Sequence, residues 1–214
     1  MKHLSSKTIT TLKATLFVVC LIPLVYLALG ALAGTLGADP VEAMTQTTGL
    51  WALRFLLLTL AVSPLRKATG WNWVVRLRRT IALYAFFYAC LHVLIYLVFE
   101  QLFDGAEIAK DIVKRPHLTA GFLSFLLMIP LAITSTQGMM RRLGGHRWQQ
   151  LHRLTYPIAA GAVLHYFWLV KRDVSAPTLY GLILAILLCI RLRVRPRHIG
   201  ATAPKAPSRV AHSS

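Results

Sequence analysis

The chain has 214 residues and a net charge of +17; 56% of its residues are hydrophobic and 14% are charged, and its mean hydropathy is +0.58. This composition excludes an ordinary soluble globular domain and predicts a protein whose solvent is a lipid bilayer. A strong positive charge is also typical of nucleic-acid-binding proteins, so the placement of the charges has to decide between the two explanations.

Six apolar stretches are long enough to cross a bilayer, at about residues 14–33, 50–65, 80–99, 117–136, 154–170 and 177–192. A spanning helix needs about 17 to 25 mostly apolar residues, so we expect an all-α bundle of six transmembrane helices. The connections are too short for a soluble domain. Residues 1–13 are then a cytoplasmic tail, residues 14–194 the membrane domain, and residues 195–214 a disordered basic tail.

The charged residues alternate between the two sides of this predicted bundle. Basic residues gather before the first stretch, between the second and third, between the fourth and fifth, and after the sixth. The positive-inside rule therefore places both termini in the cytoplasm and the chain in a bacterial inner membrane. The basic side would face anionic lipid headgroups, so membrane lipid is an expected partner and nucleic acid is not. All seven acidic residues lie in the remaining connections: Asp39, Glu42, Glu100, Asp104, Glu107, Asp111 and Asp173.

Two of the eight histidines lie deep within predicted spans, where ionisable side chains are costly and are candidates for function. His92 is in the periplasmic half of the third stretch, and His165 is near the periplasmic end of the fifth. The two stretches run in the same direction, so the two imidazoles fall at similar depth. Such a pair can bind the iron of a b-type haem axially, and no C-x-x-C-H motif for covalent attachment is present. Hydrogen bonding of each histidine to another helix is the simpler alternative.

His152 lies thirteen residues before His165, at the cytoplasmic end of the fifth stretch. If the segment is helical, the two residues are about 19 Å apart, a separation that suits two stacked redox centres. On a straight helix their side chains would point about 140° apart. Pro157 lies between them and could reorient them.

Several motifs in sequence order resemble those of one family. The turn at 143–156 reads LGGHRWQQLHRLTY. Before it lie TGLWAL at 48–53, SPLR at 63–66, RLRR at 76–79, His92, and KRP at 114–116. Together these motifs resemble the MsrQ (YedZ) family of ferric-reductase-like transmembrane proteins, over roughly residues 10 to 195.

The resemblance implies a haem-bearing membrane subunit that carries electrons and is not itself a catalyst. Such a subunit pairs as a heterodimer with MsrP, a periplasmic molybdopterin enzyme that repairs methionine sulfoxide in proteins. Its electrons come from the respiratory chain as quinol, or from a cytosolic flavin reductase. The protein's role in either case would be electron transport across the membrane.

The resemblance also implies specific cofactors. Related ferric reductases hold two haems with two histidines on each of two helices, so His92, His165 and His152 would be axial ligands here. A fourth histidine is expected near position 78, which in this chain is Arg78. One haem b is therefore expected and a second is left open. The family is also described as binding FMN, and four arginines could hold the FMN phosphate or a haem propionate, or only set topology: Arg78, Arg79, Arg147 and Arg153.

The hypothesis is that electrons enter on the cytoplasmic side, pass a centre at His152, and leave from His92 and His165. Two alternatives stay open. One is a stand-alone ferric or quinone reductase; the other is a haem-free transporter or assembly factor that uses the histidines for packing or proton relay. The natural docking surface for the electron acceptor is an acidic periplasmic connection, with Glu100, Asp104, Glu107 and Asp111.

Overall fold

The computed structural model describes residues 5–193, and this part of the chain is all helical, with no strand within it. The all-α prediction is thus confirmed for the described residues, while the predicted disordered tail at 195–214 lies outside them. A 3₁₀ helix η1 (Asn72–Arg76) precedes α3, and a π-helical segment η2 (Tyr96–Glu100) extends it. The α-helices are α1 (Ser6–Leu32), α2 (Pro40–Thr69), α3 (Arg78–Ile95), α4 (Gly105–Lys114), α5 (Pro116–Ile133), α6 (Gln137–Leu143), α7 (Gly145–His152), α8 (Thr155–Leu169) and α9 (Ser175–Arg193).

Four helical segments in the described range are long and apolar enough to cross a membrane: Lys7–Leu32, Pro40–Thr69, Arg78–Glu100 and Pro116–Ile133. The fifth and sixth predicted spans are also helices, α8 with 15 residues and α9 with 19. At 1.5 Å per residue, α8 is only about 22 Å long, less than the roughly 30 Å of a hydrocarbon core. The chain therefore has the spans of a membrane protein, and a total of six stays a prediction.

Two helix boundaries differ from the sequence-based expectation because polar residues start helices that an apolar window does not detect. Helix α2 begins at Pro40, ten residues before the predicted span, because the Asp39 side chain accepts a hydrogen bond from Glu42 N–H (2.9 Å). The connection expected at about 100–116 contains α4, whose first turn is capped in the same way by Asp104. The acidic connection is therefore a helix rather than an open loop.

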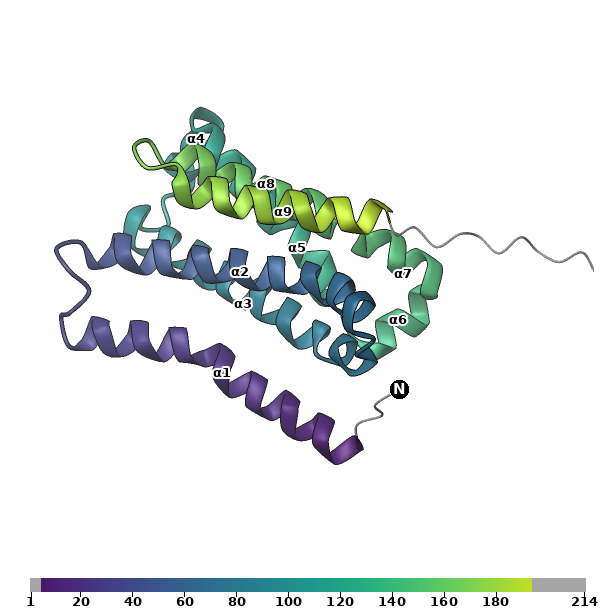
Figure 1. The fold of residues 1–214 in the computed structure, drawn as a ribbon. Helices are drawn as coiled ribbons and strands as arrows, with labels where there is room; N and C mark the ends of the chain where they lie inside the picture. Colours follow the sequence, from purple (N-terminus) through teal and green to yellow (C-terminus); the bar gives the residue numbers. More distant parts are fainter. Residues whose placement is uncertain (1–4, 194–214) are drawn as a thin grey trace, which may run out of the picture.

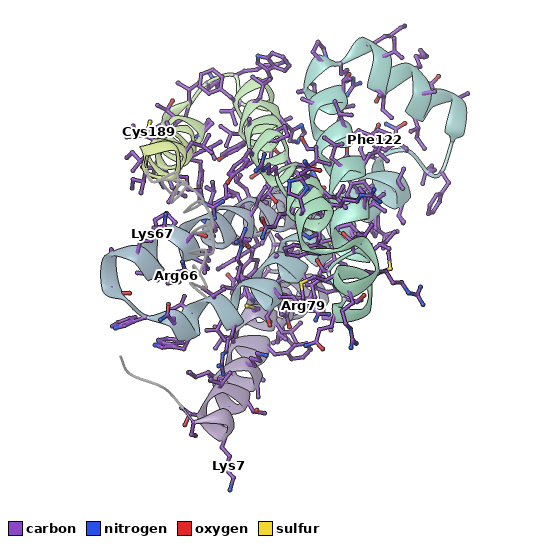
Figure 2. The ribbon with its side chains drawn as sticks, turned by 90° about the vertical axis from the view of Figure 1, so that its right-hand side faces the viewer. Lys7, Arg66, Lys67, Arg79, Phe122 and Cys189 are labelled. Carbon is purple, nitrogen blue, oxygen red and sulfur yellow. The ribbon has the colours of Figure 1, made fainter. Side chains whose placement is uncertain are left out.

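The long helices run alternately in opposite directions, so that α1 begins and α9 ends at the same end of the bundle (Figure 1). This end, with helices α6 and α7, is called the basic end; Lys7, Arg66, Lys67 and Arg79 are labelled on it in Figure 2, which looks onto it. The opposite end, with α4 and all seven acidic residues, is called the acidic end. The predicted alternation of charge thus corresponds to two ends of one bundle. The cytoplasmic location of the basic end stays a prediction.

Two helix pairs form the centre of the bundle. Helix α2 packs along α3, α5 packs along α8, and α9 contacts both α2 and α8. Leu60, Tyr88 and Ile158 are completely buried in the core shared by these helices. Large apolar side chains such as Tyr26 and Leu182 are exposed on the outside. An outer surface of this kind is suited to lipid, and the arrangement brings α3 and α8, which carry the deep histidines, into one core.

Helix α1 is bent near its middle, as Figure 1 shows, and Pro23 lies in its interior. The Tyr88 hydroxyl accepts a hydrogen bond from Leu24 N–H (3.1 Å) and donates one to Cys20 O (2.9 Å). In an uninterrupted helix, Leu24 N–H would bond directly to Cys20 O. The tyrosine hydroxyl is therefore inserted into the helix ladder at the bend and satisfies both backbone groups.

Tyr88→Phe should destabilise the protein by about 1 to 3 kcal/mol, because it leaves a backbone donor and a backbone acceptor unpaired in an apolar environment. The measurement is the thermal unfolding midpoint of the detergent-purified protein. Tyr84→Phe is the matched control, since the Tyr84 hydroxyl donates a single bond to Phe17 O (2.8 Å) and is not inserted into a ladder. Equal losses of stability in the two variants would contradict this role of Tyr88.

Candidate functional site

The structure brings together the two histidines that the sequence places at similar depth. His92 of α3 and His165 of α8 have ring centroids 6.1 Å apart and planes inclined by 77°. A metal–imidazole nitrogen bond is about 2.0 Å long, and the ring centre lies roughly 1.1 Å beyond the nitrogen. Two imidazoles on opposite sides of one metal ion therefore have centroids about 6 Å apart. The observed separation agrees with this value.

Both rings are held by a backbone carbonyl of a neighbouring helix. His92 Nδ1 lies 2.9 Å from Thr45 O on α2, and His165 Nδ1 lies 2.6 Å from His117 O on α5. A carbonyl only accepts, so each Nδ1 carries the proton and each Nε2 keeps a free lone pair. Each histidine therefore does form a hydrogen bond to another helix, as the simpler alternative expected, but it does so through Nδ1. This bond orients the ring and leaves Nε2 available as a metal ligand.

A glycine one turn after each carbonyl makes room for the imidazole. A Cβ atom on Gly49 would lie 3.1 Å from His92 Nδ1, and one on Gly121 would lie 2.7 Å from His165 Nδ1. Helices α2 and α5 therefore present the same cradle, a carbonyl at one position and a glycine four residues later. The four-residue spacing can be read from the sequence. Its role in holding the imidazoles follows only from the packing of α2 on α3 and of α5 on α8.

The two rings line a cavity of about 840 Å³ that reaches to the acidic end. This volume lies within the range of about 300 to 1,000 Å³ that is usual for cofactor sites. Its deep part is lined by apolar side chains, including Leu53, Phe125 and Ile158. Space, apolar walls and two facing imidazoles together can hold a haem-sized planar group with its metal between the rings. His117, which sequence reasoning did not single out, also lies here, with its ring centroid 6.2 Å from that of His165.

His152 differs from its sequence-based placement. It ends the separate helix α7 rather than lying on the fifth spanning helix, because a turn at Arg153 and Leu154 interrupts the chain before α8. A straight-helix argument therefore does not apply to the orientation of His152 relative to His165. Pro157 lies in the first turn of α8 and belongs to its start.

The His152 ring is stacked on Trp148, with centroids 3.9 Å apart, and its Nδ1 lies 3.0 Å from Trp148 O. Its Nε2 is buried and has no hydrogen-bond partner. Burial lowers the pKa of His152, the Trp148 and Leu131 backbone carbonyls oppose this effect, and the nearby Arg78 guanidinium lowers the pKa further. The neutral ring, which is the form that binds a metal, is therefore favoured at pH 7.

No second histidine accompanies His152 among residues 5–193. That range contains no cluster of three or more His, Cys, Asp or Glu side chains able to hold a metal ion. His146 is exposed on α7, and the charged group close to His152 is Arg78. The structure thus offers one partly buried imidazole at the basic end, that of His152, and near the acidic end the pair His92 and His165 with His117 beside it.

The four arginines considered for an anionic group are not equivalent. Arg78 is half-buried and lies within electrostatic reach of Arg191 and Tyr156, whereas the other three side chains are exposed. Arg191 donates hydrogen bonds to Tyr156 Oη and to Ser63 Oγ (2.9 Å each), and its Nε is buried without a partner. Sequence reasoning gave Arg191, at the end of the sixth apolar stretch, no role at a site. The exposed members of the set are Arg79, Arg147 and Arg153.

Arg54 is a second cation that sequence reasoning missed. It lies inside the second apolar stretch, where a charged residue is itself a signal of function. Its Nε donates to Tyr180 Oη (2.8 Å), and its guanidinium lies 4.9 Å from the centre of the Trp51 ring. The bond to Tyr180 joins α2 to α9, and the two contacts together stabilise a charge within the bundle.

The acidic residues considered for docking are partly engaged in local structure. Glu107 pairs with Lys110 at 2.7 Å, Asp111 lies 3.4 Å from Arg115, and Asp104 caps α4. Glu100 accepts a hydrogen bond from Thr45 Oγ1 (3.4 Å). All four are nevertheless on one end of the molecule, on η2 and α4, next to the mouth of the cavity.

Comparison with known proteins identifies relatives over almost the whole chain. Residues 48–163 match a family model described as ferric reductase like transmembrane component. The matched segment includes His92 and His152 and ends two residues before His165. No solved structure gives a significant match.

Three similar proteins share the name Protein-methionine-sulfoxide reductase heme-binding subunit MsrQ. That of Herminiimonas arsenicoxydans is 52% identical over 192 residues, which cover 89% of this chain and 88% of the relative. That of Azospira oryzae is 50% identical, covering 89% of this chain and 82% of the relative. That of Rhodospirillum rubrum is 49% identical, covering 92% and 93%.

Proposed function

The chain belongs to the ferric-reductase-like transmembrane family, among its MsrQ members, and from this premise we propose that it is a haem-binding electron-transfer subunit of a methionine-sulfoxide reductase system. The observation that carries the proposal is the His92–His165 pair, with centroids 6.1 Å apart in a cavity of about 840 Å³. In the proposed setting the chain lies in a bacterial inner membrane, in contact with anionic lipid.

His92 and His165 would hold haem b through their Nε2 atoms. Held by these two histidines, the haem would supply one-electron transfer with both protein ligands retained. Thr45 O and His117 O keep both rings in the tautomer that frees Nε2. The apolar walls of the cavity exclude water, which limits the reorganisation that accompanies a change of charge.

The basic end would be the entry for electrons from the quinone pool or from a cytosolic flavin reductase. His152, neutral and with an unpartnered Nε2, is the residue that supports a second centre there. Arg78, Arg79, Arg147 and Arg153 would hold the phosphate of FMN or a haem propionate by charge-assisted hydrogen bonds. Because Arg78 is the half-buried member next to His152, it is the first of the four to test.

The acidic end would be the exit. The acceptor is an MsrP-like periplasmic molybdopterin enzyme, docked at Glu100 and on α4 through Asp104, Glu107 and Asp111. The family match to ferric reductases also supports a second candidate, a stand-alone ferric or quinone reductase. A haem-free transporter or assembly factor is the remaining alternative. It predicts that the purified protein has no haem absorption bands.

Anaerobic mixing separates the first two candidates. The dithionite-reduced protein, freed of excess reductant, should be reoxidised by an MsrP-like reductase supplied with methionine sulfoxide at least about tenfold faster than by a soluble ferric chelate, because docking brings the redox centres within reach. Stopped-flow absorption of the reduced haem bands measures both rates. The reductase without its sulfoxide substrate is the control, and faster reoxidation by the chelate would favour the stand-alone reductase.

A further inference from the structure

The mouth of the His92–His165 cavity has two walls of opposite charge. The basic wall consists of Arg115, Lys171 and Arg172, at the junctions α4–α5 and α8–α9. The acidic wall consists of Asp39, Glu42 and Glu100, at the start of α2 and the end of η2. Each wall thus extends one of the two helix pairs, α5/α8 or α2/α3.

The two imidazole cradles do not by themselves decide how a haem is turned about the axis that joins the two rings. Each consists of a carbonyl, a glycine and an imidazole with a free Nε2. The apolar lining of the inner cavity restricts the orientation of the haem. Its inner lining of Leu53, Leu56, Phe125, Met128 and Ile158 is apolar, and a carboxylate buried there would be unpaired. The edge of the porphyrin that carries two carboxylates must therefore face the mouth.

At the mouth, the charges of the two walls decide toward which wall the haem carboxylates turn. Carboxylates beside Glu42 and Glu100 would face like charges, whereas carboxylates beside the basic wall would meet cations with several N–H donors. Asp173 also lines the mouth, but its side chain accepts a hydrogen bond from Ser175 N–H (2.9 Å) at the start of α9. Arg115 is more than half exposed and shares one contact with Asp111 at 3.4 Å, so it has donors left for a ligand.

We propose that Arg115, Lys171 and Arg172 bind the two carboxylates of the haem and so determine its orientation between His92 and His165. This inference rests on the proposed function in that haem must occupy the cavity. Sequence reasoning placed candidate propionate ligands only among arginines of the basic end; the structure assigns a second set to the acidic end. The same cations raise the haem reduction potential, because the ferrous state carries one positive charge fewer.

The test combines a change in the protein with a change in the ligand. The haem-free protein is prepared in two forms, the wild type and the triple variant Arg115→Gln/Lys171→Gln/Arg172→Gln. Each form is reconstituted either with haem or with haem dimethyl ester, which lacks the carboxylate charges. Haem transfer to apomyoglobin gives the dissociation rates. In wild type, haem should dissociate at least about tenfold more slowly than the ester, since the ester cannot form the charge-assisted hydrogen bonds to these cations. In the triple variant the two ligands should dissociate at similar rates.

Lys110→Gln is the matched control, because Lys110 is an exposed cation of α4 that pairs with Glu107 and does not line the cavity. It should keep the wild-type difference between haem and ester and the wild-type potential, whereas the triple variant should have a lower potential with haem. An undiminished difference in the triple variant overturns the assignment, as does an equal effect of Lys110→Gln. Failure of wild type to bind either ligand overturns the proposed function itself. If the triple variant does not fold, Arg172→Gln alone is compared in the same way.

Discussion

His92→Ala and His165→Ala should each remove the b-type haem from the purified protein. Each variant would remove one of the two proposed haem ligands and leave a void in place of an imidazole that a neighbouring carbonyl had oriented. Loss of even an outer-shell partner of a metal ligand typically costs about 10- to 100-fold in affinity, so loss of the ligand itself should cost at least about 100-fold. A reduced-minus-oxidised absorption spectrum, with haem quantified per chain, measures the effect.

His146→Ala is the control for this experiment, since His146 is exposed on α7 and should keep full haem content. His152→Ala should keep the haem at His92 and His165; a fall from two haems to one in this variant would establish a centre at the basic end. Retention of full haem by both His92→Ala and His165→Ala would refute the assignment of the pair. Wild type without haem, after expression with sufficient haem supply, would make the transporter or assembly factor the leading hypothesis.

Gly121→Ala should reduce haem content almost as strongly, although it changes no ligand. The added Cβ would lie 2.7 Å from His165 Nδ1 and 3.0 Å from its Cε1, so the ring must move away from His117 O. Overpacking of this kind costs about 1 to 3 kcal/mol, or roughly 5- to 150-fold in affinity. Gly49→Ala should have a smaller effect, because the nearest His92 atoms are 3.1 Å away.

The expected order of haem content is wild type, then Gly49→Ala, then Gly121→Ala. Low-temperature electron paramagnetic resonance gives a second readout, since displacement of an axial imidazole converts low-spin ferric haem to high-spin. Gly181→Ala is the control, because its nearest neighbour, Val163, would be 3.6 Å away in ordinary contact. A high-spin signal of equal size in Gly181→Ala would show that the effect is not specific to the cradle.

Much of the candidate site could be predicted because it depends on the hydropathy of each segment and on the order of the helices along the chain. Hydropathy placed His92 and His165 inside apolar stretches, and the direction of successive helices placed them at similar depth. The same reasoning was wrong about the helix that carries His152, since the turn at Arg153 and Leu154 has no strong breaker such as glycine or proline. It also took the polar start of α2 for a connection, because hydropathy does not detect an Asp39 cap.

The sequence by itself determined the solvent of this protein, its helical class, the separation of its charges into two ends, and the family to which it belongs, because these follow from composition, order and short motifs. Only the tertiary structure decided which groups meet. The backbone carbonyls of Thr45 and His117 carry no side-chain signal, and Gly49 and Gly121 reveal their role only when the opposing helix packs against them. The proximity of the two cations Arg78 and Arg191, which are more than a hundred positions apart in the sequence, likewise depends on how α3 and α9 are placed in the bundle. Helix packing sets these contacts, and the position of a residue along the chain does not.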